Sequence, residues 1–367
     1  MILFFIIVIV IAMIIQQISL YIAKQKNNIQ YSCKPSVEAC EPETEFLVYS
    51  TVTNTSRFLS PVLRIEERFP KSLNVLEATE FNVNITGDYR IYNSTVSMRG
   101  RQRVRRYLRA SIPDRGAYVF SFAEFHAGDF MGIKEFDYFK DNSERIVIYP
   151  PTIKKEDFLK TFTNAFEDIA LKRRLHEDPI SICGYRDYTG REPMRSISWK
   201  QSAVRNSLIV KEFDPTWRQA VTIVMDMQYH GEHEFHSRRQ EYCFSMARTI
   251  CEYLEDKNFE YRLVTNAIIT SGISSFYSSG GRGVMYERIL YALGSAKNGN
   301  VCTLEELLAN ACTGAYREKV IILITTRKTP EVLDAAMRVF KASGSEVVPL
   351  YASDYVNAET AETEEAG

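Results

Sequence analysis

The sequence predicts a multidomain α+β protein made of an N-terminal transmembrane helix, an antiparallel β-sandwich and a doubly wound α/β domain of Rossmann type. Three observations lead to this fold class. Residues 1–23 are almost entirely apolar, apolar residues recur with a period of two between Phe46 and Ile148, and apolar strands alternate with helical stretches from Ala220 onward. With 367 residues, the chain is long enough for two domains that each have a core.

The apolar N-terminal segment has the features of a membrane anchor. Residues 1–23 hold roughly the twenty apolar residues that cross a bilayer, interrupted by Gln16 and Gln17. No basic residue precedes the segment and no clear cleavage site follows it, so a cleaved secretory signal fits less well. Lys24 and Lys26 follow directly, and the positive-inside rule places such a flank in the cytoplasm. We therefore expect a single-pass cell-membrane protein that contacts lipid through residues 1–23, with its N-terminus outside and its body cytoplasmic.

The remaining patterns divide the chain into further segments. Short alternating runs separated by turn residues such as Thr86-Gly87-Asp88 favour an antiparallel sandwich. Later, near-continuous apolar strands between helices predict a parallel sheet covered on both faces. The expected segments are a transmembrane anchor at 1–23, a β-sandwich at 30–150, a linker helix and signature segment at 151–217, an α/β domain at 218–355 and a disordered acidic tail at 356–367.

The expected elements follow from the same periodicities. In the sandwich we expect strands at residues 46–53, 63–69, 81–85 and 118–122. In the α/β domain we expect strands at residues 220–227, 261–266, 320–325 and 346–351, and helices at residues 234–255, 284–295, 304–311 and 331–342.

The most distinctive stretch lies between residues 184 and 213, where tyrosine, arginine, acidic residues and one of two tryptophans are crowded together. A catalytic role would make Asp187 a base and Arg186 an anion clamp, but no histidine and no nucleophile–base pair lies in this window. Arginine and aspartate can bridge segments, and tyrosine and tryptophan contribute large contact areas. We therefore favour a structural or interface role, with the interaction residues Tyr185, Arg186, Asp187, Tyr188, Arg195, Trp199, Lys211 and Glu212.

This stretch resembles the core signature of the bacterial domain-of-unknown-function 58 family, and Arg115-Gly116-Ala117-Tyr118, Asp129-Phe130-Met131-Gly132 and Ile146-Val147-Ile148-Tyr149-Pro150 are similar to further landmarks of that family. Arg191, Ser198 and Val204 depart from the family pattern. The resemblance implies a von Willebrand factor A-like domain at the C-terminal end. It also implies a MoxR-type AAA+ ATPase as the partner, and an adaptor role in assembling or remodelling membrane or envelope complexes. It implies no reaction.

The end of the strand at 220–227 is the expected place for a ligand, because open parallel sheets bind ligands at the carboxyl ends of their strands. The resemblance implies a divalent metal held there by Asp-x-Ser-x-Ser. Asp226 is present, but Gln228 and His230 stand at the serine positions and Arg327 follows a later strand. A hard cation needs several oxygen ligands, so we expect this metal site to be lost.

Three of the five histidines nevertheless fall in one window, at His230, His233 and His236. His233 and His236 would share one face of a helix, and imidazoles suit zinc and other transition metals. The same window also fits a solvated helix start, where Glu232 and Glu234 are electrostatically favourable. We favour the solvated helix start and expect no cofactor. If a metal is bound instead, Asp226, His230, His233 and His236 are the candidate ligands.

Composition narrows the function classes. A formal net charge of −1 gives no support for nucleic-acid binding, and seven cysteines without CxxC spacing suit reduced thiols. Alternating arginines at residues 99–105 could face anionic lipid, although a solvated sheet face is the simpler interpretation. The glycine-rich loop Ser278–Gly283 could bind an anion, although a plain flexible loop is favoured. We expect a non-enzymatic interaction or adaptor protein; the alternatives are a metal-dependent enzyme at the His230–His236 edge and a secreted adhesion module.

Overall fold

The computed structural model describes residues 2–24, 28–76, 82–120, 122–129, 134–153, 158, 160, 162–163, 182–190, 192–213, 221–228, 233–270, 272–312, 320–326, 328–343 and 346–355. Most of the predicted linker helix and the whole predicted tail at 356–367 lie outside these residues. The chain forms two compact units. One comprises Met1–Pro151, Ile269–Gly272 and Arg288–Lys297, and the other comprises Thr152–Ile268, Ile273–Glu287 and Asn298–Gly367.

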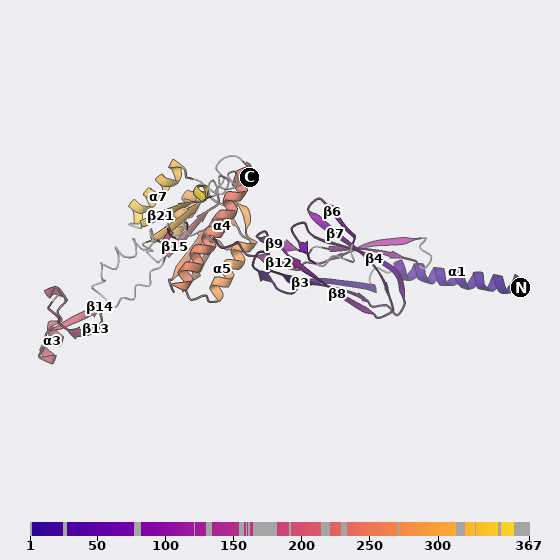
Figure 1. Cartoon of the computed structure of the whole chain (residues 1–367), viewed down its shortest axis with the longest axis horizontal. Helices are drawn as coiled ribbons and strands as arrows, with labels where there is room; N and C mark the ends of the chain where they lie inside the picture. Colours follow the sequence, from indigo (N-terminus) through magenta and orange to yellow (C-terminus); the bar gives the residue numbers. More distant parts are fainter. Residues whose placement is uncertain are drawn as a thin grey trace. The chain divides into compact units, whose positions relative to one another are not determined.

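The first unit is built from two antiparallel sheets (Figure 1). Their inner faces share buried apolar clusters. One sheet has the order β1-β3-β8-β5, with β1 (Ile29–Pro35), β3 (Phe46–Asn54), β8 (Arg103–Ser111) and β5 (Asn74–Val75). The other has the order β11-β10-β4-β7-β6, with β11 (Glu135–Asp141), β10 (Phe122–Gly128), β4 (Ser60–Pro70), β7 (Tyr89–Met98) and β6 (Asn82–Thr86). A small third sheet joins β2 (Ala39–Cys40), β12 (Arg145–Ile148) and β9 (Gly116–Val119).

Strand β4 shows how the sequence selects the two faces of its sheet. Its inward positions Leu63, Ile65 and Phe69 are buried, while Arg64 and Glu66 point to the outer face. This alternation follows from the period of two in a strand. The outer face of β4 therefore carries charge beside β10.

The prediction of one continuous strand at residues 118–122 was wrong. Val119 ends β9 and Phe122 begins β10, and these strands belong to different sheets. The backbone N–H of Phe120 between them donates to the carbonyl of Glu144. The chain therefore changes sheets where periodicity alone indicates one continuous strand.

The second unit has a five-stranded sheet with the order β18-β16-β15-β20-β21. Its strands are β15 (Val221–Asp226), β16 (Tyr261–Thr265), β18 (Ser275–Ser278), β20 (Val320–Thr325) and β21 (Glu346–Tyr351). Every residue of β15 and β20 is buried, as expected for strands covered on both faces. Its helices are α4 (His233–Asp256), α6 (Leu304–Cys312) and α7 (Pro330–Ser343). Helix α5 (Val284–Ser295) begins in this unit and belongs to the first unit from Arg288 onward, and β17 (Ala267–Ile268) pairs with β19 (Lys297–Asn300).

The prediction of a transmembrane helix was wrong. Residues Ile2–Lys24 form helix α1, but no helix in the described part of the chain is long and apolar enough to cross a membrane. The unbroken apolar run ends at Ile15, and at 1.5 Å per residue it spans about 22 Å, short of the roughly 30 Å of a hydrocarbon core. Helix α1 also packs against β4, β10 and β11, and the Gln16 amide donates a hydrogen bond of 2.6 Å to Asp129.

Two further predictions fall with that helix. Neither the single-pass localisation, with an outside N-terminus and a cytoplasmic body, nor lipid contact through residues 1–23 is retained. The helix does leave large apolar side chains exposed, among them Phe4 and Ile9.

The predicted fold class was also wrong in the relative amounts of strand and helix. Among the residues that the structure describes, 43% are in strands and 30% in helices, so β-structure dominates. The sheet of the second unit is mixed rather than wholly parallel, because its edge strand β18 runs antiparallel to β16. Individual elements of the predicted α/β region were predicted more closely, since β20 and α5 have the bounds expected from the sequence.

Candidate functional site

The distinctive stretch forms a β-hairpin that carries a short helix, and we call residues Ile182–Phe213 the signature hairpin. Strands β13 (Ile182–Asp187) and β14 (Ile209–Phe213) pair antiparallel, and η2 (Met194–Ser196) and α3 (Trp199–Arg205) lie between them. Ile197 bridges to Val210, and both are buried together with Ile209.

Helix α3 is held to strand β14 by hydrogen bonds that join Ser198 and Ser202 to Ile209. The N–H of Ser198 donates to the carbonyl of Ile209 at 2.8 Å, and the N–H of Ile209 donates to the hydroxyl of Ser202 at 2.9 Å. The Ser202 hydroxyl in turn donates to the Ser198 carbonyl. The segment therefore has a small core and a hydrogen-bond network of its own.

Glu192 organises the turn of the signature hairpin. Its carboxylate accepts the Thr189 hydroxyl at 2.7 Å and the Thr189 N–H at 3.1 Å, and it pairs with the Arg186 guanidinium at 2.6 Å. The Thr189 hydroxyl, followed by Arg186, lowers the pKa of Glu192 from 4.5 to about 2. Sequence reasoning missed Glu192 as the partner of Arg186, although the Thr-x-x-Glu spacing is a signal for such a turn.

The other predicted interaction residues are distributed over the same segment. Tyr185 on β13 lies directly opposite Lys211 on β14, and Gly184 lies opposite Glu212. Asp187 is exposed, and the Tyr188 N–H donates to the Leu208 carbonyl at 2.9 Å. Arg195 lies on η2 and Trp199 begins α3, both exposed.

The apolar surface of the signature hairpin is its most unusual property. The exposed fractions are 61% for Trp199, 68% for Met194 and 77% for Val204. Leu208 and Tyr185 are exposed as well. An exposed tryptophan together with further exposed apolar side chains of the same segment presents a surface suited to contact with another molecule.

The Asp226 edge of the second unit is filled by groups of the chain itself. One carboxylate oxygen of Asp226 accepts the Gln228 N–H at 3.0 Å and the Asn266 amide at 2.8 Å. The other accepts the Thr325 hydroxyl at 3.2 Å. Asp226 is fully buried and ties together the ends of β15, β16 and β20. Its arrangement is that of a structural carboxylate.

The arrangement of the histidine side chains predicted near this edge lies outside what the structure describes. His230 and Arg327 lie outside the residues that the structure describes, while His233 and His236 lie at the start of α4, where only their backbone is described. Within the described ranges, the one group of side chains spaced to hold a metal lies elsewhere, in the sandwich.

The glycine-rich loop Ser278–Gly283 does surround an anion, and that anion is the carboxylate of Glu255. The Ser278 hydroxyl donates to it at 2.6 Å, the Arg282 N–H at 2.5 Å and the Tyr261 hydroxyl at 2.8 Å. The loop therefore binds a side chain of α4, so these donors are already occupied.

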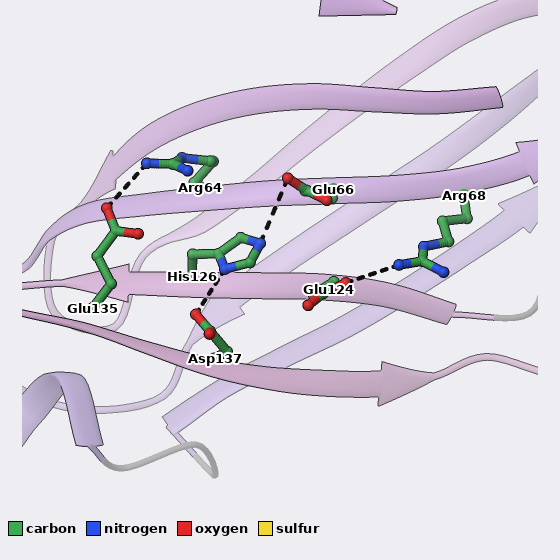
Figure 2. A network of polar contacts seen from close by, with 7 residues as sticks. All are labelled: Arg64, Glu66, Arg68, Glu124, His126, Glu135 and Asp137. Atoms are coloured by element: carbon green, nitrogen blue, oxygen red, sulfur yellow. Dashed lines mark hydrogen bonds and ion pairs between the residues drawn. The ribbon is translucent and has the colours of Figure 1, made fainter. Parts of the chain in front are cut away.

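A polar cluster that the sequence analysis missed lies on the outer face of β4, β10 and β11. Figure 2 shows His126 between Glu66 and Asp137, with Glu124 beside them. Glu66, Glu124 and His126 offer ligand atoms that all lie within 4.8 Å of one another. The signal in the sequence was the Glu-x-His spacing of Glu124 and His126, which places both on one face of a strand.

Comparisons with known proteins found likenesses to solved structures only. No protein-family model matches the chain, and no curated protein matches it. A non-cellulosomal cohesin from the archaeon Archaeoglobus fulgidus is 14% identical, covers 33% of this chain and 91% of that chain, and has a TM-score of 0.23. A cohesin in a cohesin–dockerin complex from Clostridium thermocellum is 11% identical, covers 33% and 99%, and has a TM-score of 0.23. A CARDB domain from Pyrococcus furiosus, in complex with di-metal ions, is 10% identical, covers 32% and 91%, and has a TM-score of 0.20. At these scores we draw no functional argument from the likenesses.

The comparisons give no support to the expectation of a von Willebrand factor A-like domain, and this expectation is not kept. The solved structures reported above are cohesin-like and CARDB-like β domains, and none is a von Willebrand A domain. Asp226 accepts hydrogen bonds within the chain, at the position where the resemblance implied a metal ligand. The comparisons also give no evidence for a MoxR-type partner.

Proposed function

We propose that this chain is a non-enzymatic interaction protein that binds a protein partner through the signature hairpin. The exposure of Trp199 carries this proposal. Tryptophan is a preferred anchor of protein interfaces, because its large apolar ring gains the most from leaving water while its N–H can still donate a hydrogen bond.

The surroundings of Trp199 fit a contact surface. Met194 and Val204 are even more exposed than Trp199, so one small segment leaves three large apolar side chains in contact with water. The backbone beneath them is held by Ser198, Ser202 and Ile209. A preformed surface loses little conformational entropy on binding, which favours affinity.

The charge of the signature hairpin indicates the chemistry of the partner. Among the side chains of the hairpin that the structure describes, exposed basic residues outnumber exposed acidic ones, and Arg186 is paired with Glu192. The other exposed basic residues are Arg195, Lys200 and Arg205. A partner with an acidic rim around an apolar groove would complement this surface, and opposite charges would speed the encounter.

The arrangement gives less support to catalysis by the same residues. Arg186, the anion clamp of the catalytic alternative, is engaged by Glu192 at 2.6 Å. Asp187 is exposed and faces water. An exposed aspartate beside an arginine that another carboxylate already holds is a poor candidate for a catalytic pair.

For the partner's identity, the resemblance to the domain-of-unknown-function 58 family suggests a MoxR-type AAA+ ATPase. This finer suggestion rests on the resemblance alone. The experiment below therefore also measures binding to a purified ATPase of this type.

The test uses the full chain with Trp199→Ala and Val204→Asp as separate variants and Met337→Ala as the matched control, because Met337 is a comparably exposed apolar residue on α7. Partners captured from native extract are identified, purified and titrated against each variant, and a purified MoxR-type ATPase is titrated in parallel. We expect binding to weaken at least tenfold with either hairpin variant and to be unchanged with Met337→Ala. Equal affinity of all the folded variants for every captured partner would contradict the proposal.

A further inference from the structure

The cluster on the outer face of β4 and β10 is set by strand register. Glu66 of β4 lies directly opposite Glu124 of β10, and His126 is two residues further along β10. Residues directly opposite in an antiparallel pair point to the same face, so the two carboxylates are close neighbours. Like charges in this position destabilise a sheet unless a cation lies between or beside them.

The neighbouring arginines neutralise only part of this charge (Figure 2). Arg68 pairs with one oxygen of Glu124 at 2.9 Å, and Arg64 pairs with Glu135 at 3.0 Å. Glu66 has no arginine or lysine partner among the described ion pairs, where it is paired with His126. The cluster therefore keeps an excess of negative charge around Glu66.

His126 is oriented as a metal-binding imidazole would be. Its Nδ1 lies 2.7 Å from Asp137 Oδ1, an arrangement in which the ring donates Nδ1–H to the carboxylate. Its Nε2 then carries a lone pair and lies 3.6 Å from Glu66 Oε1. That Nε2 is buried and has no hydrogen-bond partner in the described part of the chain. With the ring in this neutral form, a cation between the two atoms would remove the repulsion between their lone pairs.

A fourth polar group lies in the same row of the sheet. Asn93 of β7 lies directly opposite Glu66 on the other side, so it faces the same way. Its Oδ1 is buried and likewise has no hydrogen-bond partner in the described ranges. The row Glu124, Glu66 and Asn93 thus presents oxygen atoms from three neighbouring strands.

We propose that Glu66, Glu124 and His126 bind one divalent transition-metal ion, with Zn²⁺ as the ion of choice. Imidazole nitrogen with carboxylate oxygen is a donor set that zinc accepts, and Asp137 would orient the histidine. In a tetrahedral zinc site with bonds of about 2.0–2.1 Å, ligand atoms lie about 3.3 Å apart. The 3.6 Å between His126 Nε2 and Glu66 Oε1 is close to this value, and the full set within 4.8 Å closes with side-chain rotations.

The test measures zinc binding by calorimetry and by metal content of the full chain after dialysis at neutral pH. Because His230, His233 and His236 offer a rival site, all measurements are made in a background in which these three are alanine. We expect one Zn²⁺ per chain in this background. His126→Ala, Glu66→Gln and Glu124→Gln should each abolish stoichiometric binding, and Asp137→Asn should weaken it about ten- to a hundredfold.

Two controls keep the outcome clear. Glu135→Gln removes a carboxylate of the same face that pairs with Arg64 outside the proposed ligand set, so it should leave zinc affinity unchanged. Circular dichroism of each variant establishes that the sandwich is folded. Failure of the background protein to bind zinc, or zinc binding that survives His126→Ala in a folded protein, would overturn the proposal. Neither result bears on the signature hairpin, so this inference and the proposed function stand or fall separately.

Discussion

The guanidinium of Arg106 lies 3.0 Å from the carboxylate of Glu67, and this pair sits between the two sheets of the sandwich. Glu67 is 1% exposed and also accepts hydrogen bonds from the hydroxyls of Tyr31 and Ser50. A buried carboxylate is tolerated only when cations and donors replace its water, and here three strands supply them. The pair therefore specifies how β3, β4 and β8 come together.

Replacing Arg106 with methionine should destabilise the sandwich by about 3–5 kcal/mol, because Glu67 is then left buried without its cation. The double variant Glu67→Gln with Arg106→Met should lose less than the sum of the single variants, since no uncompensated charge remains. Urea unfolding of the four proteins measures both quantities. Additive losses would show that the two side chains do not interact.

The turn of the signature hairpin should loosen in acid. The pKa of Glu192 is lowered to about 2, so its carboxylate stabilises the turn fully above 4.5, and that contribution is lost as the pH falls from 4.5 through about 2. We expect a carbon NMR titration of Glu192 with a midpoint near 2. Thr189→Val should raise that midpoint toward 4.5, whereas a midpoint near 4.5 in the unaltered protein would contradict the hydrogen-bonded turn.

The loop around Glu255 depends on Gly280. Its φ is +81°, and a Cβ there would lie 2.8 Å from the carbonyl oxygen of Phe259. Gly280→Ala should therefore cost about 1–3 kcal/mol of unfolding free energy. Gly283→Ala is the matched control, because a Cβ at Gly283 meets nothing within 4 Å, and we expect a change within about 0.5 kcal/mol. Thermal or urea unfolding measures the loss of stability in each variant. Equal losses for Gly280→Ala and Gly283→Ala would rule out the steric argument.

Cysteine labelling should distinguish buried from accessible thiols. Burial, followed by the nearby charge of Glu67, raises the pKa of Cys33 to about 12. Burial also raises the pKa of Cys40 to about 11, although Cys40 is less enclosed. In native protein at mildly alkaline pH, mass spectrometry should find Cys33 unlabelled by iodoacetamide and Cys40 labelled slowly, with both labelled in urea. Rapid labelling of native Cys33 would show that the core around it opens readily.

Local pattern was enough to predict several elements but not the sites. The apolar runs that became β20 and α5 were predicted with their observed bounds, because periodicity and turn residues act over a few positions. The strand at 118–122 was predicted as continuous because the change of sheet after Val119 leaves no mark on the alternation. Helix α1 was predicted as an anchor because composition does not report that Gln16 bonds to Asp129.

The candidate sites show the same division. Crowding of residue types located the signature hairpin, but the pairing of Arg186 with Glu192 rather than Asp187 depends on how the turn closes. The histidine window drew attention to His233 and His236, while the group with ligand spacing contains His126.

The sequence by itself determined which runs of residues become strands and helices, and which side chains of a strand share a face, since these follow from repeats of two and 3.6 residues. Only the tertiary structure decided which strands are neighbours and in what register. Register brings Glu66 opposite Glu124 and places Asp226 within reach of Asn266 and Thr325. Such pairings join residues far apart in the chain, and their free energy depends on burial and charge that exist only after the sheets have formed.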